Sequence, residues 1–250
     1  MYRVDVLVQG YPGKSVCHGG LGWSTIALLR GEGRVILVDV GAFGIRKELE
    51  RQLAAHGVSA GDVTDVVLTH AHYDHSVNYT LFPAATVWIG RTELEWARHV
   101  PPGFNPLPEL YVQDMARSAR VRLIEDGETF LPGLTAIAAP GHTPGCLLFR
   151  MEAAPPVLFT GDAAKNRAEL LSLATDMTMD EQASRASLET VWRLWRDSPD
   201  MIVVPGHDLS MRLDAEGRPA YVGKRKAGIA AWFDEDLSVT TPIDLTKGTQ

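Results

Sequence analysis

The sequence has few cysteines, no long apolar run and no excess of basic residues, and each absence excludes a class of protein. Two cysteines among 250 residues, Cys17 and Cys146, are too few for a disulfide framework and are typical of a reducing compartment. No apolar segment approaches the roughly 18 residues of a membrane span. The first ten residues, MYRVDVLVQG, lack the basic and apolar regions of a signal peptide. We therefore predict a cytoplasmic protein with no membrane partner.

The charge balance argues against nucleic acid as a main partner. The formal net charge is −7, whereas proteins that bind a phosphate backbone usually carry an excess of basic residues. Hydrophobic residues make up 45% of the chain and charged residues 22%, which is ordinary for a globular protein. No repeat or low-complexity tract divides the sequence. Residues 1–250 are therefore interpreted as a single α/β domain.

Apolar periodicity predicts short strands interspersed with helices. Residues 45–56 and 180–197 predict helices, because apolar residues recur at three- or four-residue spacing. Thr178 and Glu181 form a capping-box pattern before the second of these. Another short helix is expected at residues 92–99. Strands are predicted at residues 4–8, 24–29, 35–38, 63–68, 86–89, 121–124, 134–138, 147–150, 157–160 and 201–204.

Two segments lack this regular alternation of predicted strands and helices. Residues 100–120 contain a proline-rich insertion with apolar character, which is interpreted either as a connecting loop or as a lid over a pocket. The tail after residue 208 contains the basic run Lys224-Arg225-Lys226, which is most simply a solvated face.

The segment VTDVVLTHAHYDH places four metal-binding side chains directly after an apolar run. Residues 66–68 predict a buried strand. His70 and His72 lie two positions apart, so in an extended chain they point the same way. Asp74 and His75 fall where the chain should turn into a helix. A solvated polar turn is the alternative, but the density of ligands favours a metal site.

Three later strands end in a similar way. Small-residue turns follow the strands and lead to His142, Asp162 and His207. Each residue alone has an ordinary explanation as a turn histidine or a helix-capping aspartate. Together they fit a shared site, because α/β folds place their chemistry beyond the strand ends.

The ordered motifs HAHYDH, PGHTPG, TGD and PGHD resemble the metallo-β-lactamase superfamily of hydrolases over about residues 20–210. This resemblance implies a four-layer αβ/βα sandwich with two metal ions in a groove between two sheets. It also implies that the first metal is held by His70, His72 and His142, the second by Asp74, His75 and His207, with Asp162 bridging both.

The donor set favours zinc, although iron or manganese would also fit. All seven side chains offer nitrogen or oxygen, which suit zinc best. Each imidazole should donate its second N–H to an outer partner. Asp39 resembles the structural aspartate of the family and is the candidate for that role. A helix cap or turn former is the alternative interpretation.

The implied reaction is hydrolysis by a metal-bridging hydroxide. Two metals that share a water lower its pKa toward neutrality, so that it can attack an electrophilic carbon or phosphorus. Asp74 is the candidate catalytic residue that orients this nucleophile and passes a proton to the leaving group. We expect a small-molecule substrate, namely a lactone, an ester or a similar activated carbonyl.

Three other functions stay open. A thioesterase of the glyoxalase II type shares the motifs, but the segment after His207 is short for its helical extension. A phosphodiesterase or ribonuclease fits the acidic balance poorly. A metal-stabilised binding module without turnover is the non-enzymatic alternative. Acyl-homoserine lactonases match in size and in all seven ligands, but their tyrosine after the bridging aspartate is missing here.

Candidate substrate-binding residues lie in the insertion and beside the metal motifs. Lys165, after Asp162, could bind a carboxylate or an oxyanion. Met177 and Met179 could complete an apolar wall, although ordinary packing is an equal explanation for each. The oligomeric state is not fixed, and a homodimer stays open. The remaining candidates for the pocket are Tyr73, Phe104, Leu107 and Tyr111.

Overall fold

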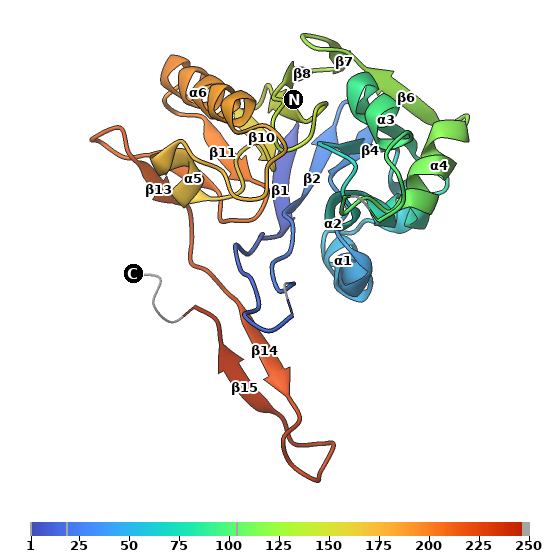
Figure 1. The fold of residues 1–250 in the computed structure, drawn as a ribbon, viewed down its shortest axis with the longest axis vertical. Helices are drawn as coiled ribbons and strands as arrows, with labels where there is room; N and C mark the ends of the chain where they lie inside the picture. The colour runs from blue at the N-terminus through green and yellow to red at the C-terminus, as the bar shows by residue number, and fades with distance from the viewer. Residues whose placement is uncertain (1, 19, 104, 247–250) are drawn as a thin grey trace.

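Two β-sheets pack face to face, and helices cover the outer surface of each sheet (Figure 1). The computed structural model describes residues 2–18, 20–103 and 105–246. In this part of the chain, no helix is both long enough and apolar enough to cross a membrane.

The first sheet has the strand order β1-β2-β3-β4-β5-β6. Strands β1 to β3 run antiparallel, and β3 to β6 run parallel. All four residues of β4 are buried, which agrees with its continuous apolar run. The strands span Arg3–Val8 (β1), Ile26–Gly31 (β2), Arg34–Val38 (β3), Asp65–Leu68 (β4), Thr86–Gly90 (β5) and Val121–Ile124 (β6).

The second sheet has the order β13-β12-β11-β10-β9-β8-β7. Its neighbours are antiparallel except for β10 and β11, which are parallel. The strands span Thr129–Leu131 (β7), Leu134–Ala138 (β8), Leu147–Met151 (β9), Val157–Gly161 (β10), Ile202–Pro205 (β11), Met211–Leu213 (β12) and Pro219–Tyr221 (β13).

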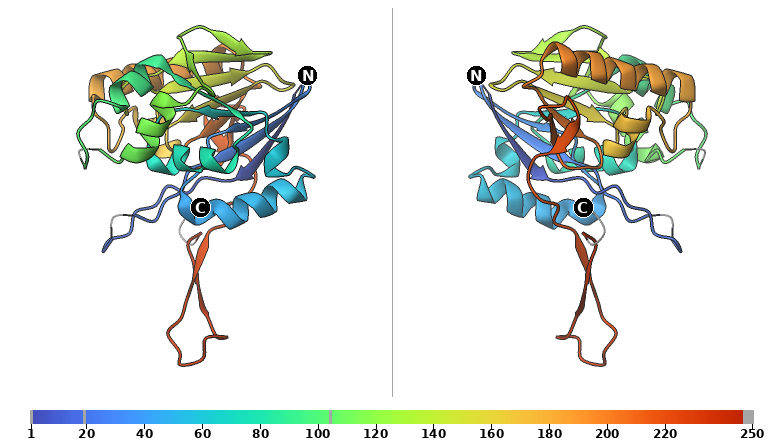
Figure 2. Two further views of the ribbon diagram at one scale, coloured as in Figure 1. Left: turned by 90° about the vertical axis from the view of Figure 1, so that its right-hand side faces the viewer. Right: turned by 90° about the vertical axis from the view of Figure 1, so that its left-hand side faces the viewer.

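The helices divide between the two outer faces (Figures 1 and 2). The first sheet is covered by α1 (Arg46–Ala55), α2 (Tyr73–Ser76), α3 (Arg91–Ala97) and α4 (Glu109–Arg117), with short 3₁₀ turns at Phe43–Ile45, Ala60–Asp62 and Val77–Leu81. The second sheet is covered by α5 (Arg167–Ser172) and α6 (Glu181–Asp197).

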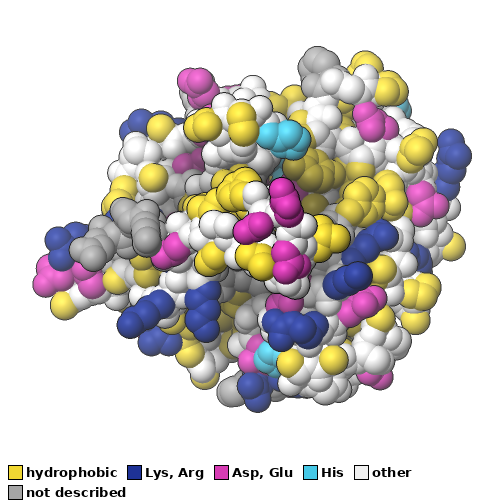
Figure 3. Space-filling model, turned by 90° about the horizontal axis from the view of Figure 1, so that it is seen from below, with side chains coloured by type: hydrophobic (Ala, Val, Ile, Leu, Met, Phe, Trp, Pro, Cys, Tyr) yellow, Lys and Arg dark blue, Asp and Glu magenta, His cyan; other side chains and the backbone are white. Residues whose placement is uncertain are grey.

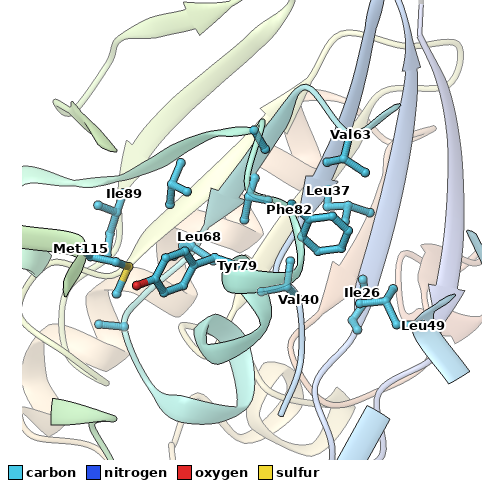
Figure 4. Close-up of a cluster of buried hydrophobic side chains, with 14 of the residues drawn as sticks. Ile26, Leu37, Val40, Leu49, Val63, Leu68, Tyr79, Phe82, Ile89 and Met115 are labelled. Carbon is cyan, nitrogen blue, oxygen red and sulfur yellow. The ribbon is translucent and has the colours of Figure 1, made fainter. Parts of the chain in front are cut away.

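Three apolar clusters fill the spaces between these layers. Leu37, Leu49 and Phe82 belong to the cluster between the first sheet and its helices (Figure 4). Phe149 lies in the cluster between the two sheets, and Trp195 lies between the second sheet and α6. The layers are therefore helix, sheet, sheet and helix, which confirms the expected four-layer αβ/βα sandwich.

The insertion at residues 100–120 is only partly a loop. Residues 109–117 form α4, and Val112 and Met115 anchor its buried face. These two apolar residues stand three apart after the last proline, Pro108, and this helical spacing was not recognised in the sequence.

The predicted Thr178–Glu181 capping box is also wrong. Asp180 is the N-cap of α6, and its carboxylate accepts the Ala183 N–H.

The tail after residue 208 holds more structure than expected. Strands β12 and β13 extend the second sheet, and β14 (Gly228–Ala231) pairs with β15 (Thr241–Asp244) in a separate hairpin. This hairpin projects away from the sandwich (Figures 1 and 2). Lys224 and Lys226 are exposed as expected. Arg225 is not, because its side chain is only 8% exposed and pairs with Asp208.

Candidate metal centre

The segment after β4 positions the first group of histidines. The buried strand ends at Leu68, and the extended chain beyond it carries His70 and His72 with their rings 4.7 Å apart. His72 stands at the start of α2, and one helical turn then brings His75 to the same place. His70 and His75 are fully buried, and their ring centroids lie 4.2 Å apart.

The later strand ends deliver the other side chains to the same point. His142 follows β8, Asp162 follows β10 and His207 follows β11. The structure brings together all seven predicted ligand residues. Their donor atoms form three groups, each within 4.8 Å: His70, His72 and His142; His70, His75 and Asp162; and Asp74, His75 and His207.

Asp162 lies between the two sets of histidines. One carboxylate oxygen, Oδ1, is 3.2 Å from Nε2 of His75 and 3.2 Å from Nε2 of His207. The other oxygen, Oδ2, is 3.3 Å from Nε2 of His142. The half-buried Asp74 is 3.4 Å from Nε2 of His207. Asp162 can therefore reach ions on both sides.

Two buried polar atoms in this centre have no hydrogen-bond partner among the described residues. They are Nε2 of His70 and Oδ1 of Asp162, and the latter faces only the Nε2 atoms of His75 and His207 without a well-formed hydrogen bond. Buried polar atoms are almost always satisfied, so such orphans call for an ion or a water. A nitrogen and oxygen donor set of this density suits a divalent metal such as zinc. The residues present fit a metal centre.

Outer hydrogen bonds orient three of the rings. Nδ1 of His75 donates to Asp39 at 2.8 Å, Nδ1 of His142 donates to the carbonyl of Met177 at 2.9 Å, and Nδ1 of His70 lies 3.1 Å from the Thr69 hydroxyl. With Nδ1 engaged in this way, each ring turns its Nε2 toward the centre, the atom that a metal would take.

Asp39 holds two parts of the motif at once. Besides His75, it accepts the N–H of Thr69 at 2.9 Å and the Thr69 hydroxyl at 2.8 Å. Its own φ of 54° lies in the left-handed region, which costs a non-glycine residue energy. The prediction that Asp39 contacts a ligand ring is confirmed.

Burial keeps three of the histidines neutral. It lowers the pKa of His70 well below its ordinary value, lowers that of His72, and lowers the pKa of His142 to about 3. A neutral imidazole is the form that binds a metal. These three rings are therefore ready to act as ligands at neutral pH.

The remaining histidines face carboxylates. Burial disfavours the charged form of His75, but Asp162, Asp74 and Asp39 more than offset this and raise its pKa well above the ordinary value. The pKa of His207 is also raised, because Asp162 outweighs the effect of burial. Burial opposes ionisation of Asp162, yet the rings of His207 and His75 hold its pKa well below the usual range. Negative charge at this point favours a cation.

Glu93 in α3 is a buried residue that the sequence reasoning missed. Its Oε1 accepts the Ala71 N–H at 2.9 Å, and its Oε2 accepts the Gly145 N–H at 3.1 Å. A Cβ at position 145 would lie 2.1 Å from the Glu93 nitrogen, so only glycine allows this approach. Glu93 thus ties the first histidine segment to the PGHTPG loop. Nothing in the sequence distinguishes it from the exposed Glu95.

Two further contacts were also missed. The amide oxygen of Asn105 hydrogen-bonds Nε2 of His72, which leaves Nδ1 of that ring facing His142 at 2.9 Å. Asp208, next to His207, accepts the Arg167 N–H at 3.0 Å. Asn105 lies in the insertion, so its contact with the centre could not be predicted without the fold.

A cavity of about 670 Å³ opens over the centre. Its lining includes Tyr73 and Lys165 among the predicted pocket residues, together with Asp74, Met177 and Met179. The Lys165 ammonium lies 3.0 Å from a carboxylate oxygen of Glu169, which also lines the cavity.

Two of the predicted pocket residues are not in this lining. Leu107, which precedes α4 by two residues, is buried in the cluster between the first sheet and its helices. Tyr111 packs on the rings of Tyr79 and Phe43. Both side chains therefore lie outside the lining of this cavity, and their role in substrate binding stays a prediction. Phe104 lies outside the described residues.

The layered fold and its histidine- and aspartate-rich centre are those of a metallo-hydrolase superfamily. A family model described as the metallo-beta-lactamase superfamily matches residues 19–207. The chain belongs to this superfamily.

Several relatives are similar to parts of this chain. An N-acyl homoserine lactonase from Bacillus sp is 25% identical over 66% of this chain and 64% of its own length. Human metallo-beta-lactamase domain-containing protein 1 is 36% identical over 49% of this chain and 40% of its own length. The Xenopus laevis protein of the same name is 28% identical over 88% of this chain and 85% of its own length. The first two matches thus span less than two thirds of those relatives.

Solved structures confirm the fold. A metallo-beta-lactamase candidate from Thermotoga maritima has a TM-score of 0.69 at 24% identity, covering 84% of this chain and 99% of that one. AidC, described as a dizinc quorum-quenching lactonase in complex with a product, has a TM-score of 0.66 at 20% identity. The match covers 81% of this chain and 80% of that one. At these identities the likeness concerns the fold.

Proposed function

We propose that this chain is a single-domain, dinuclear metal-dependent hydrolase that acts on a lactone, an ester or a similar activated carbonyl of a small molecule. The observation that carries the proposal is the convergence of seven donor side chains, with the orphaned His70 Nε2 and Asp162 Oδ1 among them, beneath a cavity of about 670 Å³. The free thiols of Cys17 and Cys146 support a reducing location such as the cytoplasm.

Two sets of residues would hold the ions. His70, His72 and His142 form the first set, and Asp74, His75 and His207 form the second, with Asp162 between them. Zinc is the metal that the donors favour. When bound, the ions would lower the pKa of a water molecule and polarise the carbonyl of the substrate.

Asp74 is the proposed catalytic residue. Its side chain lines the cavity and retains 20% exposure, so it can reach a substrate from the edge of the centre. The carboxylate can accept a hydrogen bond from the attacking water and so orient it. It can then carry the released proton to the leaving oxygen, a transfer that typically contributes 10²- to 10⁴-fold.

The walls of the cavity suit a small amphipathic substrate. Tyr73, Met177 and Met179 offer apolar surface, with exposed fractions of 45%, 60% and 45%. Lys165 supplies a cation within the same cavity. An acyl chain could lie on the apolar wall while a polar group faces Lys165. The similarity to lactonases supports a lactone, but no tyrosine lies between Tyr111 and Tyr221 to repeat their motif.

A hydrolysis panel tests this proposal. The protein is reconstituted with zinc and assayed on an acyl-homoserine lactone, an aryl ester, a glutathione thioester, a β-lactam, a phosphodiester and a short RNA. Asp162→Asn, which keeps the shape of the side chain, is the matched control.

The outcomes separate the candidate functions. Turnover of the lactone or ester that Asp162→Asn abolishes supports the proposal. Cleavage of the thioester alone identifies a thioesterase, and cleavage of the phosphodiester or RNA alone identifies a nuclease. Full metal content without any turnover identifies a binding module. Each of these last three results overturns the proposed substrate class.

A further inference from the structure

Residues 228–245 form an arm that leaves the sandwich as a two-stranded hairpin, in which residues 232–240 form the loop at the tip (Figures 1 and 2). Ile229 lies opposite Ile243 in the hairpin, and Ala231 lies opposite Thr241. The two isoleucines therefore share one face. An isolated two-stranded hairpin is at best marginally stable in water, so a projecting arm of this kind is expected to have a partner surface.

The arm exposes more large apolar side chains than a solvated hairpin requires. Trp232, Phe233 and Leu237 are 59%, 77% and 85% exposed. Ile229, Val239 and Ile243 are also exposed. Exposed large apolar side chains that gather on one segment are a feature of interaction sites. Viewed toward the end of the arm, hydrophobic and acidic side chains lie next to each other (Figure 3).

The root of the arm is fixed to the body of the protein. The guanidinium of Arg225 forms an ion pair with the buried Asp208 and lies over the rings of Tyr11 and Tyr221. The Tyr11 hydroxyl donates to the carbonyl of Leu245 at 3.1 Å. Both chain segments of the root are therefore anchored, so the arm has a defined direction.

Charge is distributed along the arm with opposite signs at its two ends. The tip carries three consecutive exposed carboxylates at Asp234, Glu235 and Asp236. The root carries the exposed ammonium groups of Lys224 and Lys226, together with the carboxylate of Asp244 at the end of β15. Ile229 and Ile243 lie between these ends, whereas Trp232, Phe233 and Leu237 flank the three carboxylates in the loop that joins β14 to β15. One arm therefore offers a tip with apolar and acidic side chains, an apolar shaft and a root with two lysines.

We propose that the arm docks on the arm of a second copy of this chain, antiparallel about a twofold axis. In that arrangement each acidic tip meets the basic root of the partner, and the two apolar shafts cover each other. A twofold interface requires such a self-complementary surface, in which each copy supplies both halves of the match. An anionic membrane is a poorer occupant, because its surface would repel the three carboxylates of the tip.

The first experiment measures molar mass by light scattering during size exclusion, with the zinc-loaded full chain. Wild-type protein is expected to elute at twice the mass of one chain. Trp232→Ser/Phe233→Ser should elute as a monomer with an unchanged circular dichroism spectrum. The matched control is Leu110→Ser/Leu171→Ser, which removes two apolar side chains that are 83% and 51% exposed on other surfaces. This control should remain a dimer.

A charge-swap experiment tests the antiparallel pairing itself. The tip variant Asp234→Lys/Glu235→Lys/Asp236→Lys and the root variant Lys224→Glu/Lys226→Glu each bring like charges together in a homodimer. Each variant alone should be monomeric. Mixing them should restore a dimer, because both tip–root contacts of the heterodimer are again between opposite charges. This rescue also shows that neither variant is merely unfolded.

Three results would overturn the proposal. They are a wild-type monomer at tens of micromolar protein, a dimer that survives the Trp232 and Phe233 substitutions, and no heterodimer on mixing the charge variants. Binding of wild-type protein to vesicles of mixed phosphatidylcholine and phosphatidylserine, lost in Trp232→Ser/Phe233→Ser, would instead assign the arm to a lipid surface. None of these results depends on the proposed hydrolase activity.

Discussion

Nδ1 of His75 donates a hydrogen bond to Oδ2 of Asp39 at 2.8 Å. This contact joins a strand end to the helix that carries His75, and it leaves Nε2 of the ring facing Asp162 at 3.2 Å. A fixed tautomer and a fixed ring direction are what a metal-binding imidazole needs. Asp39 thus acts on the proposed second ion through His75.

Asp39→Asn should weaken metal binding. The amide cannot accept every hydrogen bond that the carboxylate accepts from His75 and Thr69, so the ring loses its orientation. We expect zinc affinity to fall roughly 10- to 100-fold, measured by competition with a chromogenic chelator. Asp200→Asn, at an exposed position, is the control and should bind zinc like the wild type. Unchanged affinity in Asp39→Asn would show that the contact has no effect on the centre.

Asp74→Asn should remove most of the turnover of the zinc-saturated enzyme. The amide can still point toward the centre but cannot take up a proton. We expect kcat to fall by on the order of 10²-fold or more. Activity and zinc content are measured on the same samples, so that loss of metal is distinguished from loss of proton transfer. A metal-replete variant with wild-type kcat would exclude the proposed role of Asp74.

Glu93 should make the stability of the metal-free protein depend on pH. Burial raises the pKa of its carboxyl from 4.5 to about 7, even though Ala71, Thr143 and Gly145 donate hydrogen bonds to it. Between these pH values the folded protein holds a proton that the unfolded chain has released. Stability present at low pH is therefore lost as pH rises from about 4.5 to 7, by roughly 3 kcal/mol at most.

Urea unfolding of the chelated protein between pH 4.5 and 8 measures this effect. Glu93→Gln has no proton to lose, so its free energy of unfolding should rise relative to that of the wild type as pH increases through this window. Glu95→Gln, an exposed position on the same helix, should follow the wild type. A constant difference between Glu93→Gln and the wild type at all pH values would contradict the assignment.

Lys165→Ala should impair binding of anionic substrates more than turnover. The ammonium lines the cavity beside Glu169 and can attract a substrate carboxylate without touching the reacting bond. We expect KM for a carboxylate-bearing ester to rise about tenfold while kcat changes little, which is the signature of lost uniform binding. A neutral ester of the same size is the control substrate. An equal rise in KM for both esters would indicate a packing role only.

The donor cluster could be predicted because its geometry follows from local rules. His70 and His72 stand two apart on an extended chain, and the later donors all follow strand ends that meet at one edge of the sandwich. Asp39 was named through its resemblance to the structural aspartate of the family, and it directly follows the buried end of β3. These positions depend on the alternation of side chains along a strand and on where each strand ends. Both can be predicted from the pattern of polar and apolar residues in the sequence.

Other parts of the site depend on packing between distant segments. Glu93 reaches the centre only because α3 lies against both the Ala71 and Gly145 backbones. Tyr111 was expected in the pocket because α4 was not recognised, and on that helix it packs against Tyr79, whereas Leu107, just before the helix, is buried in the core. The arm was missed because its four-residue strands show little alternation of polar and apolar residues.

The metal content of the purified chain tests the central proposal most directly. Protein is stripped with a chelator, reconstituted with excess zinc, desalted and analysed by inductively coupled plasma mass spectrometry. We expect about two zinc ions per chain in the wild type and a clear loss in Asp162→Ala, because that side chain lies between both sets of histidines. A wild-type chain that retains no zinc, or an Asp162→Ala variant that retains as much as the wild type, would contradict a dinuclear centre at these residues.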